Sequence, residues 1–94
     1  MTDEISIRYR EAVARGERVA VATVTAGPRA GSRLLVWSAG QTYGDLGSPR
    51  LNQRVALYAE QLFDRKNPPE SSTKRFELPG VGEVEVSIEL ASPA

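Results

Sequence analysis

The stretch "RVAVATVT", residues 18–25, decides the fold, because both of its alternating sets of side chains are apolar or small. Positions 19, 21 and 23 carry Val, Val and Thr, and positions 20, 22 and 24 carry Ala, Ala and Val. Successive side chains of a strand point to opposite faces. A strand without a polar face is typical of the centre of a sheet covered on both sides. The alanines allow a helix to approach closely.

A helix is predicted before this strand, ending at Gly16. Its apolar side chains have the helical spacing i, i+4, i+7 and i+8, at Ile5, Tyr9, Ala12 and Val13. Asp3 and Glu4 fall in the first turn, where carboxylates interact favourably with the positive end of the helix dipole.

Two further strands are predicted after the central one. The loop "AGPRAGS", residues 26–32, leads into the strand "RLLVWS", residues 33–38. A turn then precedes a short third strand, "QTYGDL", residues 41–46.

A second helix is expected to start after Ser48, with this hydroxyl as N-cap and Pro49 at the first helical position. It should stop near Arg65, before a connector with two prolines. Its apolar face consists of Leu51, Val55, Tyr58, Ala59 and Leu62. Leu57 lies off this face: it is either a simply exposed leucine or part of a self-association or partner surface.

The chain ends in a predicted hairpin of strands 73–78 and 83–90. We expect Phe76 to pair with Val84, which places Arg75 opposite Glu85. The whole chain, residues 1–94, is then a single α+β domain with the order α-β-β-β-α-β-β. We expect a mixed five-stranded sheet with two packed helices.

The composition excludes most catalytic sites. With no cysteine and no histidine, the chain builds neither a disulfide, a zinc site nor an imidazole base. No G-x-x-x-x-G-K-[ST] or G-x-G-x-x-G nucleotide motif is present, and no recognisable pair of catalytic carboxylates. The sequence therefore predicts a protein that is not an enzyme, with no catalytic and no metal-binding residue.

Charge and hydropathy restrict the partners. Twelve basic residues cancel twelve acidic ones, which argues against a nucleic-acid binder. Residues 1–66 hold ten basic and seven acidic residues, whereas residues 67–94 hold two and five. No apolar run approaches ~18 residues and no secretory leader is recognisable, so we expect a cytoplasmic protein without a membrane contact.

One candidate binding site lies where the second helix begins. Helix N-termini leave backbone N–H groups unpaired, and a neighbouring cation makes them attractive to anions. The predicted anion-binding set comes from this loop and from the loop after the central strand: Arg29, Gly31, Ser32, Gly47, Ser48 and Arg50. In the alternative interpretation Ser48 only caps the helix, the glycines only serve turns and the arginines are solvated.

Four segments in this order resemble the N-terminal domain of the XdhC/CoxI family: "ERVAVATVT", "GPRAGSRLLV", "GQTYGDLGS" and "GEVEVSIEL". Family members are accessory factors for molybdenum hydroxylases such as xanthine dehydrogenase and carbon monoxide dehydrogenase. The resemblance implies a maturation factor that binds molybdenum cofactor, whose phosphate and pterin would suit the anion site. Implied partners are a molybdenum hydroxylase subunit, a longer homologue or a second copy.

The sequence departs from the family pattern at two cysteine positions. Where the family reads glycine-glycine-cysteine before the helix, this chain has Ser48-Pro49-Arg50, and residues 79–82 read Pro-Gly-Val-Gly where cysteine-glycine-glycine is common. A thiolate ligand to molybdenum is therefore impossible. The dinucleotide-type domain of longer members is also absent, so we expect either a stand-alone member with altered chemistry, which the polar ending favours, or a fragment. The alternative function is an interaction module that has lost its ligand. It would bind a second copy, a longer homologue or a dehydrogenase subunit through Leu57 or the edge of the last hairpin.

Overall fold

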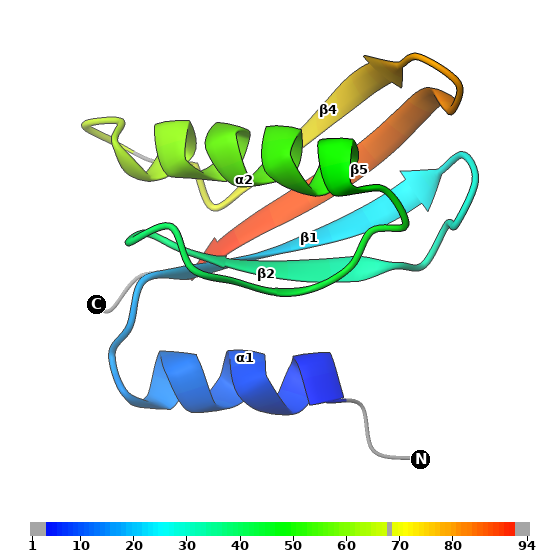
Figure 1. Cartoon of the computed structure of the whole chain (residues 1–94). Coiled ribbons are helices and arrows are strands. Elements are labelled where there is room, and N and C mark those ends of the chain that lie inside the picture. Colours follow the sequence, from blue (N-terminus) through cyan, green and yellow to red (C-terminus); the bar gives the residue numbers. More distant parts are fainter. Residues whose placement is uncertain (1–3, 68, 92–94) are drawn as a thin grey trace.

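A computed structural model of the chain describes residues 4–67 and 69–91. A five-stranded sheet with strand order β3-β2-β1-β5-β4 lies between two helices, α1 on one face and α2 on the other (Figure 1). The predicted α+β class and element order are confirmed, with the bounds α1 Glu4–Ala14, β1 Val19–Ala26, β2 Arg33–Trp37, β3 Thr42–Gly44, α2 Pro49–Phe63, β4 Ser71–Leu78 and β5 Gly82–Ala91.

The central position predicted for residues 18–25 is confirmed, since β1 pairs with β2 on one side and with β5 on the other. Its side chains supply two separate cores. Ala20, Ala22 and Val24 belong to the larger core, together with the buried face of α2. Val19 belongs to a smaller core beneath α1, with Ala12 and Leu35.

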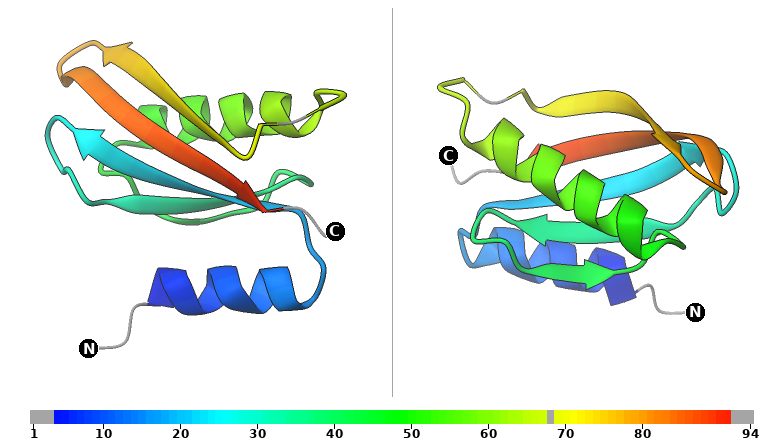
Figure 2. Two further views of the ribbon diagram at one scale, coloured as in Figure 1. Left: turned by 180° about the vertical axis from the view of Figure 1, so that it is seen from behind. Right: turned by 45° about the horizontal axis from the view of Figure 1, so that its top comes forward.

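The sheet is antiparallel throughout, so the prediction of a mixed sheet is wrong. The pairings make β3 and β4, on either side of α2 in the chain, run in the same direction. They lie at opposite edges, however, because the β4–β5 hairpin places β5 next to β1 (Figure 2). The predicted hairpin register is confirmed, with Phe76 opposite Val84 and Arg75 opposite Glu85.

Helix α1 ends as predicted, in a glycine turn. Gly16 has a φ of 78° and donates its N–H to the carbonyl of Val13, while Glu17 donates to the carbonyl of Ala12. This pair of bonds is the Schellman arrangement. Val13 was expected on the apolar face but is 45% exposed, because α1 buries only the narrow side that carries Ala12. Asp3 lies outside the described residues.

Helix α2 begins at the predicted cap. The Ser48 hydroxyl accepts the N–H of Leu51, and Pro49 is the first helical residue. The helix ends at Phe63, two residues before the predicted end, and Phe63 is buried although it was not assigned to the apolar face. Leu57 is 58% exposed, as its position off that face predicted.

A larger side chain on the α2 side of β1 should destabilise the protein. Ala22 has no exposed surface, so Ala22→Leu should lower the free energy of unfolding by about 1–3 kcal/mol through overpacking. Ala26→Leu, the same change at an exposed position of the same strand, should change it by less than about 0.5 kcal/mol. Urea denaturation of both variants measures the difference. Equal stability of the two would contradict the close packing of α2 on β1.

Candidate functional site: the loop before α2

The loops after β1 and β3 meet at one end of the sheet and bring three of the six predicted residues together. Arg29, Gly47 and Ser48 line a pocket of about 260 Å³, whose other lining residues are Pro28, Leu46, Leu51, Gly80, Val81 and Val84. The Arg29 side chain crosses Gly47 so closely that a Cβ on that glycine would stand 2.8 Å from its Cγ. Arg29 itself has a φ of 66°, a left-handed conformation that costs a non-glycine residue free energy.

The other three predicted residues do not line this pocket. Gly31 donates its N–H to the carbonyl of Val24 at 2.8 Å, and Ser32 donates to the carbonyl of Arg29 at 3.1 Å, so both close the turn between β1 and β2. Arg50 is exposed in the first turn of α2. The sequence therefore located the meeting of two loops but overestimated the number of residues that converge.

Side chains of the loop occupy three of the backbone donors that were expected to be open. Gly47 donates its N–H to Asp45 Oδ1 at 2.8 Å, and Leu46 donates to Asn52 Oδ1 at 2.8 Å. The N–H of Leu51 is directed at Ser48 Oγ at 3.5 Å. These three donors are therefore already bound within the chain. Asp45 and Asn52 were missed, although aspartate two residues before glycine is a recognisable side-chain turn.

The loop also supplies its own negative charge. Hydrogen bonds from the Gly47 N–H and the Asn52 amide hold the pKa of Asp45 below its ordinary value of 3.8, and the positive charge of Arg29 lowers it further. The Asn52 amide donates to Asp45 Oδ1 at 3.0 Å. The carboxylate of Asp45 thus accepts from two donors at this site and lies within the electrostatic influence of Arg29.

The residues present do not fit molybdenum cofactor. Pockets for such ligands usually measure ~300–1,000 Å³, and the pocket at Arg29 measures about 260 Å³. Three amide donors beside it are used internally, and the chain has no cysteine to bind the metal. Among residues 4–67 and 69–91, no group of histidine, cysteine, aspartate and glutamate side chains is placed to hold a metal ion.

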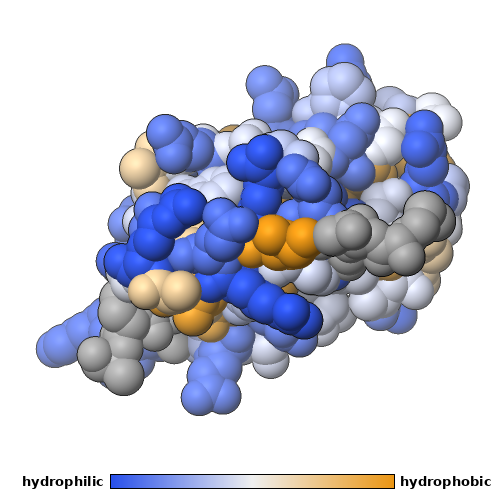
Figure 3. Space-filling view, turned by 90° about the horizontal axis from the view of Figure 1, so that it is seen from below, coloured by the Kyte–Doolittle hydropathy of each residue, from blue (hydrophilic) through white to orange (hydrophobic). Residues whose placement is uncertain are grey.

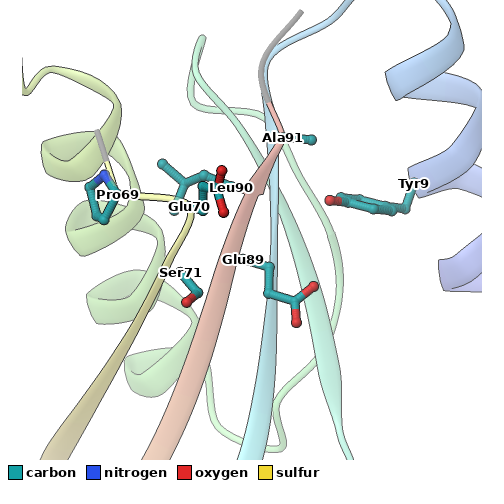
Figure 4. A pocket seen from close by; sticks show the side chains of 7 residues that line it. All are labelled: Tyr9, Pro69, Glu70, Ser71, Glu89, Leu90 and Ala91. Atoms are coloured by element: carbon teal, nitrogen blue, oxygen red, sulfur yellow. The ribbon is translucent and has the colours of Figure 1, made fainter. Parts of the chain in front are cut away.

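A larger pocket, of about 550 Å³, lies at the opposite end of β5 (Figure 4). Tyr9 points from α1 toward β5, and burial, followed by the charge of Glu89, raises the pKa of its phenol. Two carboxylates, Glu70 and Glu89, line the pocket with Pro69, Ser71, Leu90 and Ala91, and none of these residues is basic. This chemistry does not suit an anionic ligand either.

The outer surface on the α1 side is mostly hydrophilic, with small separate hydrophobic areas (Figure 3). Within the described ranges, neither helix has the length and apolar character that a membrane crossing requires.

The contact between Gly47 and Arg29 can be isolated with a double-mutant cycle. Gly47 and Gly31 have similar φ values of 104° and 97°, but a Cβ at Gly31 would meet nothing within 4 Å. Gly31→Ala should lower the free energy of unfolding by about 1–3 kcal/mol through backbone strain. Gly47→Ala should lower it by more, because its Cβ also meets the Arg29 side chain. An Arg29→Ala background removes Cγ and Nε but keeps the Cβ of residue 29, which stands 3.3 Å from the added Cβ. The excess loss of Gly47→Ala over Gly31→Ala should therefore shrink clearly in that background, as measured by urea denaturation. An excess of unchanged size would exclude the Arg29 side chain beyond Cβ as its cause.

The Asp45 interactions predict a pH-dependent contribution to stability. Since the folded pKa lies below the unfolded one of ~3.9, the contribution is present above that pH and is lost as the pH falls through the folded value. The decrease in the free energy of unfolding caused by Asp45→Asn should therefore be largest near neutral pH and should become smaller in acid. In an NMR titration, the Asp45 carboxyl should titrate below 3.8, and Asn52→Ala should move the midpoint upward. An unchanged midpoint would contradict the role of Asn52.

Comparison with known proteins identifies a family for this chain. No curated protein sequence matches the chain. The family model described as the XdhC and CoxI family matches residues 12–77 of the 94, from the end of α1 through β4. This match includes both loops of the pocket and the whole of α2. The chain belongs to the XdhC and CoxI family.

Proposed function

We propose that this protein is a non-enzymatic accessory factor in the cytoplasmic maturation of a molybdenum hydroxylase of the xanthine or carbon monoxide dehydrogenase type. It acts through contacts with other proteins rather than by holding the cofactor before α2. Family membership supports the pathway. The proposed partners are a hydroxylase subunit or a longer homologue.

The observation that carries this proposal is the self-contained loop before α2. Asp45, Asn52 and Ser48 accept from three of its backbone donors, and Arg29 covers Gly47. A site that has closed on itself in this way supports loss of the ligand, which the missing cysteines also favour.

The outer face of α2 is better suited to a partner than the edge of the hairpin. Leu57 is exposed there and borders two pockets, of about 460 and 350 Å³. The edge strand β4 instead carries Lys74, Arg75 and Glu77, all exposed. Charged side chains on an edge strand oppose pairing with a further strand. We therefore place the contact at α2.

Anion binding at Arg29 is the second candidate. Backbone strain often accumulates at functional sites, and the left-handed Arg29 beside Ser48 is such a feature. Calorimetric titration with a pterin phosphate tests this candidate directly. Under the proposed function no binding heat is expected, whereas saturable heat that Arg29→Ala abolishes would favour the cofactor-binding role.

The two candidates predict opposite results for two surface variants. In a host whose molybdenum hydroxylase requires this gene, Leu57→Asp should leave the hydroxylase with little molybdenum, because it disrupts the contact face. Arg29→Ala should support normal molybdenum content, measured by metal analysis of the purified hydroxylase. Circular dichroism confirms that both variants fold. Loss of molybdenum with Arg29→Ala and not with Leu57→Asp would reverse the assignment, and a hydroxylase indifferent to the gene would end the proposal.

A further inference from the structure

We propose that α2 is a self-association surface, on which the α2 helices of two copies pack antiparallel with a two-fold axis at Leu57. This inference deepens the proposed function, since it names a second copy as the partner of the same face. It rests on the residues that α2 turns away from the sheet, together with its C-cap residue Asp64. We call them the outer stripe: Arg50, Gln53, Arg54, Leu57, Glu60, Gln61 and Asp64.

The outer stripe is one continuous face. Its members follow the spacing i, i+3, i+4, i+7, i+10, i+11 and i+14, which keeps side chains on one side of a helix. Six of the seven are exposed and Glu60 is half-buried. The opposite side of α2 holds its buried residues, Leu51, Val55, Ala59, Leu62 and Phe63. Association along the stripe therefore leaves the core intact.

The stripe is self-complementary about Leu57. Arg54 and Glu60 lie three residues on either side of it, and Arg50 and Asp64 lie seven residues on either side. In an antiparallel pair centred on Leu57, each arginine faces a carboxylate of the second copy. Gln53 and Gln61, four residues on either side, face one another as amides. A parallel pair would place arginine against arginine and carboxylate against carboxylate.

The same arrangement is unfavourable within one chain. Arg50 and Arg54 are like charges at i,i+4, as are Glu60 and Asp64, and such pairs destabilise a helix. The arginines stand at the N-terminal end and the carboxylates at the C-terminal end, opposite to the preference of the helix dipole. An antiparallel partner brings opposite charge to both ends.

These four charges have no ion pair or side-chain hydrogen bond within residues 4–67 and 69–91. Other exposed charges do: Arg15 pairs with Glu11 at 3.1 Å, and Arg75 pairs with Glu83 at 3.2 Å. The outer stripe thus carries both signs of charge, separated along the helix and unused inside the molecule.

Leu57 supplies the apolar centre of the contact. It borders a pocket with Gly40, Thr42 and Ala56 on the β3 side, and a pocket with Tyr58 and Phe76 on the β4 side. The two pockets lie beside the ridge formed by α2 and can receive side chains of the second copy. A single helix pair buries less than the ~1,200–2,000 Å² of a stable interface. The dimer is therefore expected to be reversible and weakened by salt.

Sedimentation equilibrium of the full chain at low salt tests the pairing. The wild type should approach the mass of two chains as concentration rises. Leu57→Asp should have the mass of one chain, and Arg54→Glu or Glu60→Arg should each weaken the dimer about tenfold or more, because each reverses two symmetry-related pairs. An equimolar mixture of Arg54→Glu with Glu60→Arg should dimerise again, since every contact between the two variants is then complementary.

The matched control is Arg10→Glu, the same change at an exposed position of α1, which should leave the dimer unchanged. The antiparallel orientation is tested by disulfide cross-linking with introduced cysteines, which replace uncharged glutamines. The chain has no cysteine of its own that could interfere. Gln53→Cys mixed with Gln61→Cys should form a heterodisulfide on mild oxidation, and neither variant alone should cross-link.

Three results would overturn the pairing: a wild type that stays at the mass of one chain, a Leu57→Asp variant that still dimerises, or cross-linking of Gln53→Cys with itself. These outcomes are separate from failure of the proposed function, which is read from the molybdenum content of the hydroxylase. A monomeric protein that still supports a loaded hydroxylase would remove the self-association alone.

Discussion

The structure depends on the packing of β1 between two layers. Ala20 and Ala22 have no exposed surface on one face, and Val19 has none on the other. A strand buried in this way tolerates neither a polar side chain nor a cavity. It orders the rest of the chain, because β2 and β5 pair with its two edges and each helix covers one of its faces. The loop that follows β1 is carried to the start of α2 as a result.

Where these two loops meet, side chains of the protein itself bind several of the backbone N–H groups. Asp45 accepts from Gly47 and Asn52, and Arg29 lies across the glycine. Three backbone donors at this site, those of Leu46, Gly47 and Leu51, are held by neighbouring side chains. We therefore place the proposed partner contact on the exposed side of α2. Leu57 is exposed there, and four charges have no ion pair within residues 4–67 and 69–91.

Local sequence signals predicted the elements well, because they act within a few residues. Ser48 with Pro49 fixed the start of α2, and the alternation around Val84 fixed the hairpin register. The antiparallel sheet was not predicted, because strand direction depends on which strands become neighbours. The pairing of β5 with β1 joins segments that are far apart in the sequence. At the candidate site, the proximity of the two loops follows from the order of the strands, but the bonds of Asp45 and Asn52 depend on side-chain geometry that sequence patterns do not give.

The two helices differ in how firmly they are held. Only Ala12 of α1 is fully buried, whereas α2 buries five side chains. The attachment of α1 relies on lighter contacts, such as the Arg8 guanidinium 4.1 Å above the Tyr43 ring and the bond from Arg33 to the Ser6 hydroxyl at 3.0 Å. Partial opening of a protein begins where least apolar surface is lost. We therefore expect α1 to open before the rest of the fold, which would expose the face of β1 and β2 that this helix covers.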